Sequence, residues 1–169
     1  LIPYNQPFHK RSTTDPLSDD WYDALVISDY DKGFLTTEKI FELVEWFEGP
    51  VFIDSKKTKL PKKSCYVKIN EDEYKKLDNP SKNFIVTKGG KGAEYKGKLY
   101  PAEKVNVFDV VGAGDTFFGI CSLAIGSKIN NKVCMLMGAI SASFSIDQLG
   151  NKLFFDFKTL KKHLTHIFK

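Results

Sequence analysis

Residues 109–117 read Asp109-Val110-Val111-Gly112-Ala113-Gly114-Asp115-Thr116-Phe117. In this stretch three small residues precede an acid, and an apolar helical pattern follows over residues 116–125. Small residues let backbone N–H groups approach an anion, and a helix N-terminus adds unpaired N–H groups and the positive end of its dipole. A carboxylate beside such an anion hole can accept a proton from a hydroxyl that attacks a phosphoryl group. The stretch therefore predicts Asp115 as a catalytic base.

The same residues also allow a purely structural interpretation. Gly112 to Gly114 can form a tight turn, and Asp115 can cap a core helix, because Asp is common at helix starts. The local pattern does not favour one interpretation over the other.

The composition is that of an ordinary globular domain, since 42% of the 169 residues are hydrophobic and 14% are aromatic. Lysine and arginine total 25 against 21 acidic residues, and the net charge of +4 is spread along the chain. This charge gives no indication of a nucleic-acid partner and suits an acidic small-molecule substrate. Cys65, Cys121 and Cys134 lack a metal-binding spacing, so we expect reduced thiols and no disulfide.

The sequence contains no apolar run that approaches the length of a membrane span. Its first residues, Leu1-Ile2-Pro3-Tyr4, include neither an initiator Met nor the pattern of a signal peptide. We therefore expect a cytoplasmic protein without membrane contact, and the chain is a candidate fragment of a longer one. Residues 1–22 predict an extended arm or edge strand because they are rich in proline and polar residues, and residues 23–169 predict one domain.

Short apolar strands alternate with helical patterns, which predicts an α/β fold with a mostly parallel sheet. The predicted strands cover residues 23–28, 51–54, 65–69, 84–87 and 105–108, and a β-hairpin is predicted over residues 93–100. The strand at 105–108 would deliver the glycine-rich turn that precedes Asp115. The predicted helices run from Thr36 to the stop at Gly49-Pro50, over residues 116–125, from Asn130 to Ile146 and from Asp156 to Ile167.

Asn70 and Glu73 form an N-x-x-E unit directly after a predicted strand. Oxygen ligands at this spacing could hold the hydration shell of Mg²⁺, which tends to keep its waters. The unit also fits a helix N-cap, in which Asn70 caps the helix and Glu73 completes a capping box. The two roles can coexist.

Residues 87–92, which read Thr-Lys-Gly-Gly-Lys-Gly, form a glycine-rich turn after another predicted strand. The segment is not a Walker loop, and a simple β-turn into the hairpin explains its glycines as well. Lys32 and Lys56 follow predicted strands, where a phosphorylated substrate would need cationic partners. A solvated surface position is the commoner fate of a lysine.

The longer string DVVGAGDTFFG, residues 109–119, resembles the signature of ribokinase-like (PfkB-type) carbohydrate kinases. The resemblance implies a ribokinase-like three-layer sandwich, of which this chain would be the C-terminal nucleotide-binding portion, with ATP and Mg²⁺ as cofactors. It implies that Asp115 is the catalytic base and that Gly112, Ala113 and Gly114 form the anion hole. It also implies that Asn70 and Glu73 are associated with Mg²⁺ and phosphate.

The resemblance further places a set of residues beside the nucleotide. The set comprises Thr87, Gly89, Gly92, Ala139, Ala142 and Ser143, with Lys88 and Lys91 as weaker phosphate candidates. Core packing alone explains the residues of the predicted helix at 130–146 equally well.

Residues 28–33, Ser28-Asp29-Tyr30-Asp31-Lys32-Gly33, are similar to the S-D-Y-x-K-G segment of kinases that phosphorylate D-glycero-D-manno-heptose 7-phosphate. These kinases include the kinase half of the bifunctional ADP-heptose synthesis enzyme. The resemblance extends to residues 53–56 and 148–150 and covers roughly residues 23–150. Asp31, Ser55 and Gln148 differ from the residues usual in that group, which are Gly, Pro and Lys.

This resemblance implies phosphorylation of a heptose 7-phosphate at C1, a step toward ADP-heptose and the lipopolysaccharide core. The substrate-binding residues that it implies are Asp29, Lys32, Lys56 and Asp109. ATP and a sugar phosphate are then the expected partners, with a homodimer or a missing N-terminal portion as further expectations. The alternative is a non-catalytic nucleotide-binding module, or a regulatory partner, that lacks the sugar site.

Overall fold

The computed structural model describes residues 22–147 together with residues 158, 161, 162 and 165. Within these residues, six strands form one sheet in the order β1-β2-β3-β4-β5-β6. The strands are β1 (Leu25–Asp29), β2 (Val51–Ser55), β3 (Cys65–Asn70), β4 (Ile85–Thr87), β5 (Ala93–Tyr95) and β6 (Lys98–Tyr100). Strands β1 to β4 pair in parallel, whereas β4, β5 and β6 pair antiparallel, so the prediction of a mostly parallel sheet is confirmed.

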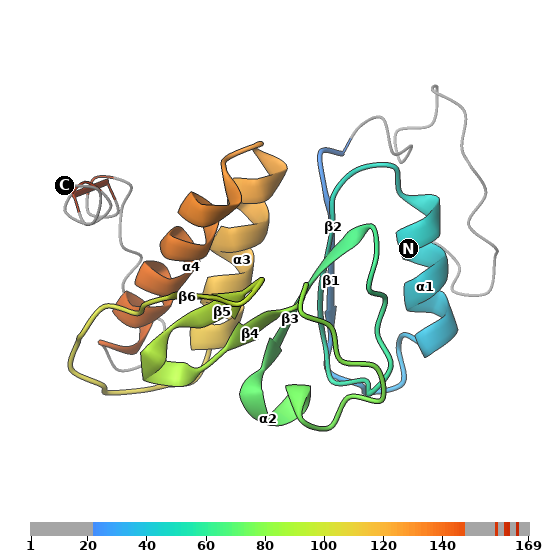
Figure 1. Cartoon of the computed structure of the whole chain (residues 1–169), viewed down its shortest axis with the longest axis horizontal. Coiled ribbons are helices and arrows are strands. Elements are labelled where there is room, and N and C mark those ends of the chain that lie inside the picture. The colour runs from blue at the N-terminus through green and yellow to red at the C-terminus, as the bar shows by residue number, and fades with distance from the viewer. Residues whose placement is uncertain (1–21, 148–157, 159–160, 163–164, 166–169) are drawn as a thin grey trace.

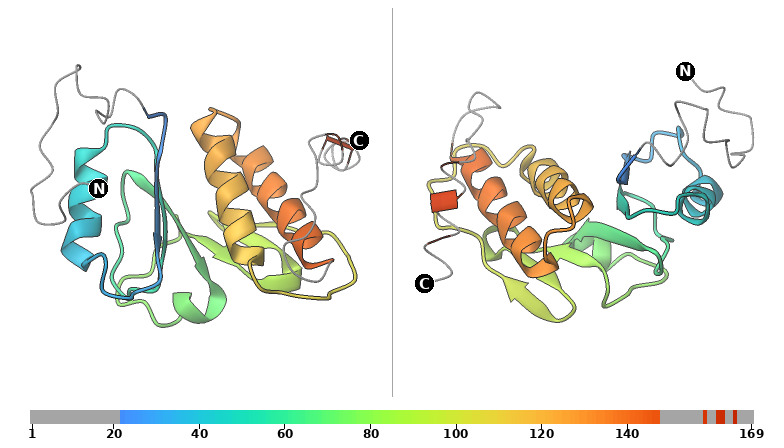
Figure 2. Two further views of the ribbon diagram at one scale, coloured as in Figure 1. Left: turned by 180° about the vertical axis from the view of Figure 1, so that it is seen from behind. Right: turned by 90° about the horizontal axis from the view of Figure 1, so that it is seen from above.

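The longer helices of the described part pack against the sheet, and the short helix α2 directly follows β3. They are α1 (Thr37–Trp46), α2 (Glu71–Tyr74), α3 (Ala113–Gly126) and α4 (Asn131–Ile146), and a 3-10 turn spans Gly89–Lys91. Figures 1 and 2 show α1 beside β1 and β2, while α3 and α4 pack together beside β4, β5 and β6.

The two faces of the sheet pack against different helices. Side chains alternate between the faces along a strand, and in β2 Val51 and Ile53 join the buried cluster that includes Ile40 of α1. Phe52, which lies between them, joins the other buried cluster together with Phe117 of α3. Helices therefore cover both faces of the sheet.

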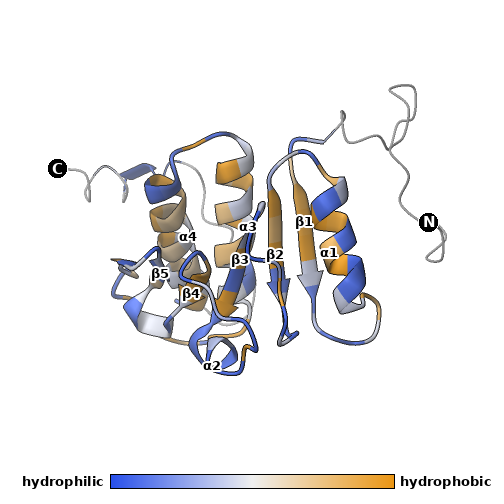
Figure 3. Ribbon diagram, turned by 45° about the vertical axis from the view of Figure 1, so that its right-hand side comes forward, coloured by the Kyte–Doolittle hydropathy of each residue, from blue (hydrophilic) through white to orange (hydrophobic). Residues whose placement is uncertain are grey.

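The parallel strands become polar at their carboxyl ends. Figure 3 shows β1 and β2 as hydrophobic through most of their length and hydrophilic at their tips. The tips carry Asp29 in β1, Asp54 in β2, Lys68 and Asn70 in β3 and Thr87 in β4. Because parallel strands end on the same edge of a sheet, these polar groups collect at one edge, where α/β proteins bind ligands.

Local sequence signals account for the ends of α1. The Thr36 side chain caps the helix by accepting a hydrogen bond from the Lys39 N–H at 3.2 Å. Ile40, Leu43 and Val44 form its buried face, as the 3.6-residue period predicts. The predicted start of this helix is therefore confirmed.

The predicted hairpin is also confirmed, since β5 and β6 pair antiparallel across residues 96 and 97. Lys96 and Gly97 both have positive φ angles, 51° and 75°, as a two-residue hairpin turn requires. Gly92, which precedes β5, has φ 102°, and a Cβ atom there would lie 2.0 Å from the Tyr100 carbonyl oxygen. The close approach of these two backbone segments requires a glycine at position 92.

The prediction of a strand over residues 105–108 is wrong. Residues 101–107, which lead from β6 toward α3, have no regular secondary structure. The N–H groups of Phe108 and Asp109 donate to the Ile146 carbonyl at the end of α4, at 2.8 and 3.3 Å. Because these N–H groups bind a helix end, they cannot take part in a strand ladder.

Helix α3 begins earlier than the prediction of residues 116–125. Gly112 is its N-cap residue, in the left-handed conformation with φ 81°, and Ala113 and Gly114 already belong to the first turn. The N-cap has no side-chain hydrogen bond, so the glycine serves by its conformation alone. The small residues are thus the helix start itself and not a turn before it.

Two predictions fall on residues outside the described part of the chain. They are the arm over residues 1–22, of which only Tyr22 is described, and nearly all of the helix from Asp156 to Ile167, of which Lys158, Lys161, Lys162 and Thr165 are described as helical. Among the described residues, no helix has both the length and the apolar character needed to cross a membrane. All three cysteines are free thiols, and Cys121 and Cys134 are buried.

Candidate active site

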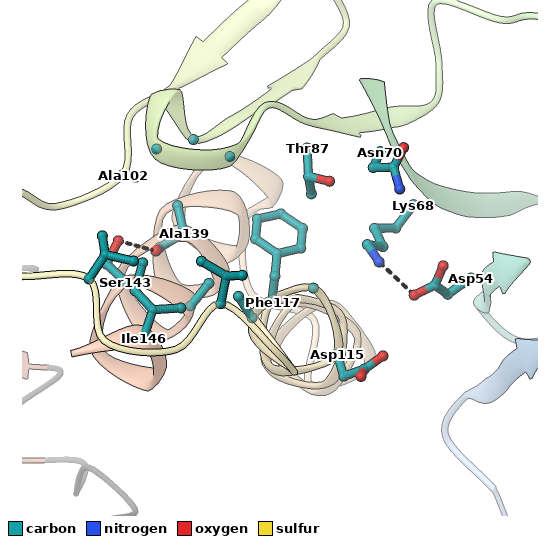
Figure 4. A pocket seen from close by; sticks show the side chains of 18 of the residues that line it. Asp54, Lys68, Asn70, Thr87, Ala102, Asp115, Phe117, Ala139, Ser143 and Ile146 are labelled. Atoms are coloured by element: carbon teal, nitrogen blue, oxygen red, sulfur yellow. Dashed lines mark hydrogen bonds and ion pairs between the residues drawn. The ribbon is translucent and has the colours of Figure 1, made fainter. Parts of the chain in front are cut away.

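A cavity of about 820 Å³ lies between the carboxyl ends of the parallel strands and the start of α3. Figure 4 shows Asp54, Lys68, Asn70 and Thr87 on the sheet side of this cavity and Asp115 at the start of the helix. The predicted site residues that line it are Asp29, Lys56, Asn70, Thr87, Gly89, Gly92, Ala113, Gly114, Asp115, Ala139, Ala142 and Ser143. The structure thus brings together most of the residues that the sequence singled out.

The start of α3 presents unpaired amide groups to the cavity. The Thr116 N–H donates to the Gly112 carbonyl at 2.8 Å, while the N–H groups of Gly114 and Asp115 have no hydrogen-bond partner within the described residues. The Asp115 carboxylate stands beside them and is exposed to solvent. Its Oδ1 atom accepts a hydrogen bond from the Tyr30 hydroxyl at 3.0 Å. Free amides and a carboxylate are the two parts that an anion hole with a base requires.

A buried ion pair forms the cavity wall opposite α3. Lys68 Nζ donates to Asp54 Oδ2 at 2.6 Å, and the two residues are only 6% and 8% exposed. Burial raises the pKa of the Asp54 carboxyl, and the nearby Lys68 ammonium opposes that rise. A Cβ atom on Gly114 would lie 3.0 Å from Lys68 Nζ, so the ammonium reaches the first turn of α3. A cation is therefore available close to the free amides.

Asn70 and Glu73 form a reciprocal capping box at the start of α2. The Glu73 N–H donates to Asn70 Oδ1 at 2.8 Å, and the Asn70 N–H donates to Glu73 Oε2 at 3.1 Å. Lys56 donates to the other Glu73 oxygen, and this hydrogen bond raises the pKa of Lys56. Burial acts to raise the pKa of Glu73, but Lys56 and the Asn70 N–H together hold it below its usual range. The predicted cap is confirmed, and a second lysine reaches the sheet edge.

Asp29 lines the cavity, but both of its carboxylate oxygens have protein partners. Oδ2 accepts from the Ser55 hydroxyl at 2.8 Å, and Oδ1 accepts from the Asp31 N–H at 3.0 Å. Lys57 lies 3.6 Å from the same carboxylate and is paired with Asp31 at 2.5 Å. Asp29 therefore links the end of β1 to the end of β2.

The far end of the cavity is lined by small side chains and by α4. A Cβ atom on Gly89 or Gly90 would meet no atom within 4 Å, so this turn leaves open space beside the cavity. The Ser143 hydroxyl donates to the Ala139 carbonyl at 2.9 Å and accepts from the Glu103 N–H at 3.0 Å. Ala139 also belongs to the buried core. Residues of α4 therefore belong to the core and also line the cavity. Core packing and a place beside a ligand do not exclude each other.

The sequence model of the pfkB family carbohydrate kinases matches residues 62–153. The chain belongs to this family. The matched range contains the N-x-x-E unit, the glycine-rich turn at 87–92 and the start of α3, which are the parts that surround the cavity.

Curated relatives of this PfkB-family chain include bifunctional proteins. The chain is 27% identical over 153 residues to the "Bifunctional protein HldE" of Nitratiruptor sp.. It is 29% identical over 157 residues to the protein of the same name from Blochmanniella pennsylvanica. Each alignment covers 76% of this chain and 33% of the relative, so the chain spans about a third of these relatives.

Solved structures show the same fold. The chain superimposes on the ribokinase of Thermotoga maritima with a TM-score of 0.64 and 22% identity, covering 85% of this chain and 57% of that one. For the Arabidopsis thaliana ribokinase complexed with ribose and ATP, the TM-score is 0.67 at 19% identity, with 84% and 55% covered. The expected ribokinase-like fold is confirmed, and the chain is a partial version of it.

Six of the residues predicted from the resemblance do not line the cavity themselves. Two of them are the weaker phosphate candidates Lys88 and Lys91, of which Lys88 is paired with Glu94 at 2.6 Å. Gly112 is the N-cap of α3, and Asp109 Oδ1 accepts from the Val111 N–H at 2.9 Å, which orders the approach to that helix. Glu73 reaches the cavity only through its partners, Lys56 and Asn70. Lys32 is exposed in the turn after β1.

The sequence analysis did not single out four parts of this PfkB-family chain that line the cavity. They are Tyr30, Asp54, Lys68 and the segment around Val105 and Val107, all of which line the cavity. A signal for Lys68 was present, because a lysine inside an otherwise apolar buried strand needs a charged partner. Val105 and Val107 gave no such signal, because the prediction of a strand over residues 105–108 did not suggest a position on a cavity wall.

Proposed function

We propose that this chain forms the nucleotide-binding and catalytic part of a PfkB-family sugar kinase. One observation carries the proposal: Asp115, at the start of α3, lines the same cavity as the cations of Lys56 and Lys68. A carboxylate and two ammonium groups around free helix amides suit phosphoryl transfer to a hydroxyl.

In this proposal Asp115 accepts the proton of the attacking sugar hydroxyl. The first turn of α3, which follows Gly112 and contains Ala113 and Gly114, then stabilises the negative charge that develops on the transferred phosphoryl group, through the unpaired amides of Gly114 and Asp115. Lys56 and Lys68 contribute positive charge from the sheet side, where both line the cavity. The small residues Gly89, Gly92, Ala139 and Ala142, with Thr87 and Ser143, bind the rest of the nucleotide.

The oxygen atoms of Asn70 and Glu73 at the sheet edge suit Mg²⁺ that is bound through its water ligands. Among the described residues, no cluster of three or more His, Cys, Asp or Glu side chains forms a cage for a metal. Asn70 and Glu73 already accept hydrogen bonds, yet each oxygen keeps a second lone pair that can accept from a metal-bound water. Mg²⁺ usually retains several waters, and it would supply positive charge to the phosphates of ATP.

The proposed acceptor is C1 of D-glycero-D-manno-heptose 7-phosphate, in the synthesis of ADP-heptose. The S-D-Y-x-K-G similarity at residues 28–33 and the relatives named HldE support this choice. Lys32 and Lys56 would contact the phosphate group of the sugar phosphate, while Asp109 would contribute by ordering the approach to α3 through its bond to the Val111 N–H. Asp29 would contribute by holding the turn that carries Lys32, because its own carboxylate oxygens are already bonded.

The second candidate is a nucleotide-binding module that does not phosphorylate sugar by itself. The chain spans 33% of its HldE relatives and 57% of the T. maritima ribokinase, which favours a part that another segment or chain completes. In this case the cavity would bind ATP without turnover.

ATP consumption with Mg²⁺ and a panel of sugars, including heptose 7-phosphate, tests both candidates. We expect turnover with one sugar phosphate, and Asp115→Asn should lower kcat by about 100-fold or more while ATP affinity stays within about twofold. Asp23→Asn, which makes the same change at an exposed position away from the cavity, is the matched control. ATP binding without turnover by the chain and by its full-length parent would support the second candidate. Equal loss of binding and turnover in Asp115→Asn would make Asp115 a structural residue.

A further inference from the structure

We propose that Tyr30 is a positioning residue, whose hydroxyl holds the Asp115 carboxylate through Oδ1 and leaves Oδ2 to receive the substrate proton. The inference rests on the proposed function of Asp115 as the base. It adds a residue from the segment directly after β1 to the carboxylate at the start of α3.

The contact joins two segments that lie far apart in the sequence. The Tyr30 hydroxyl donates to Asp115 Oδ1 at 3.0 Å across a separation of 85 residues. Asp115 accepts no other side-chain hydrogen bond within the described part of the chain, and its side chain stands on the exposed start of a helix. An exposed Asp samples several rotamers, so this single hydrogen bond decides which way the carboxylate points.

Tyr30 is itself held from both sides. Before it, the Asp29 carbonyl accepts from the Lys56 N–H at 3.1 Å, and the Asp29 carboxylate accepts from Ser55 at 2.8 Å. After it, the Asp31 N–H donates back to Asp29 at 3.0 Å, and Asp31 adopts the left-handed conformation with φ 55°. Asp adopts this conformation more readily than most non-glycine residues, and the Asp31 N–H bond and the ion pair with Lys57 hold it there. The backbone that carries Tyr30 is therefore preorganised.

The charges around Tyr30 keep its hydroxyl a donor. The hydrogen bond to Asp115 and the charge of that carboxylate raise the pKa of Tyr30 above its ordinary value of 10.0. Asp54 acts in the same direction and Lys56 against it. Tyr30 is thus protonated throughout the neutral range, and a hydrogen bond to a carboxylate is stronger than one between neutral groups.

The kinetic test is Tyr30→Phe, which removes only the hydroxyl. We expect kcat to fall about tenfold, the value of one charge-assisted hydrogen bond, with KM for ATP unchanged. Tyr66→Phe is the matched control, because Tyr66 lies in β3, stacks on Phe52 and does not line the cavity. A Tyr30→Phe variant with the kcat of the unmodified protein overturns the positioning role and leaves the proposed function standing.

A second readout needs no turnover. Titration of the Tyr30 phenol, followed by NMR of tyrosine labelled at Cζ and assigned by its loss in Tyr30→Phe, should show a pKa above 10.0. Asp115→Asn should move this titration back toward 10.0, whereas Asp23→Asn should not. An unmoved titration in Asp115→Asn overturns the contact. Absence of turnover with every sugar, in both the chain and its parent, overturns the proposed function and this role together, even where the titration moves.

Discussion

Lys68 Nζ lies 2.6 Å from Asp54 Oδ2, and both side chains are buried at the wall of the cavity. Neither charge is stable there alone, because a buried charge without a partner loses its hydration. The pair therefore couples the stability of the fold to the place where a phosphate would bind.

Removing one member of this pair should destabilise the protein. We expect Lys68→Met to lower the free energy of unfolding by about 3 kcal/mol, because Asp54 stays buried without its cation. The double variant Lys68→Met/Asp54→Leu should recover much of that loss, since it removes both charges. Urea unfolding of the three proteins at pH 7 measures the difference. A double variant as unstable as the single one would mean that the packing of Lys68, not its charge, matters.

Gly114 should matter for nucleotide binding more than for stability. An alanine there would place Cβ 3.0 Å from Lys68 Nζ, and the flexible end of the lysine can move away. We expect the free energy of unfolding to change by less than about 1 kcal/mol, because alanine also favours the helix. The Kd of ATP should nevertheless rise. Gly119→Ala on the same helix, where a Cβ meets no atom within 4 Å, is the matched control and should leave the Kd unchanged.

Gly92 should tolerate no side chain. Its φ is 102°, and a Cβ atom would lie 2.0 Å from the Tyr100 carbonyl oxygen, so backbone has to shift. Gly92→Ala should cost about 3 kcal/mol of unfolding free energy. Gly97 also has a positive φ, but a Cβ atom there would meet no atom within 4 Å. Gly97→Ala should therefore lower the free energy of unfolding by only about 1 kcal/mol. Thermal and urea unfolding measure both, and equal costs would show that conformation, not the clash, dominates.

Glu73 should make stability depend on pH in the acid range. Its pKa in the folded chain lies below the ordinary value of 4.5, so its interactions stabilise the fold above pH 4.5 and are lost as the pH falls through the folded pKa. Glu73→Gln keeps a side chain that can complete the capping box but removes the charge. We expect the free energy of unfolding of the wild type to be higher than that of this variant by about 1 kcal/mol or less at pH 7. At pH 3 the difference should be smaller still.

Urea unfolding at several pH values between 3 and 7 checks this expectation. Asp72→Asn, one residue earlier and with an 84% exposed side chain, is the control for loss of a nearby charge. A difference between wild type and Glu73→Gln that does not shrink at low pH would contradict the assigned hydrogen bonds.

Features that depend on neighbours in the sequence could be predicted from it. The Thr36 cap, the Asn70–Glu73 box and the turn at Gly97 all follow from residues a few positions apart. The strand predicted at 105–108 is absent, and the N–H of Phe108 at its end binds the Ile146 carbonyl, a partner that no local pattern reveals.

In the candidate site, too, local features could be predicted from the sequence and long-range contacts could not. The residues found from the sequence belong to short motifs, such as the one that ends in Asp115. The missed residues act through distant partners: Lys68 and Asp54 are 14 positions apart, and Tyr30 and Asp115 are 85 apart. Hydrophobic periodicity predicts which face of a strand is buried, but not which charge from another strand meets it.

The cavity draws its lining from Ser28 to Ile146, which is nearly the whole described chain. The site consequently exists only after long-range strand pairing is complete, and such pairing is the slow part of folding. A nucleotide that binds only the folded chain raises the free energy of unfolding by about 2.7 kcal/mol at one hundred times its Kd. The fraction of chain with bound nucleotide and the resistance to proteolysis would then both report the folding equilibrium. A cell depleted of nucleotide would degrade this protein faster.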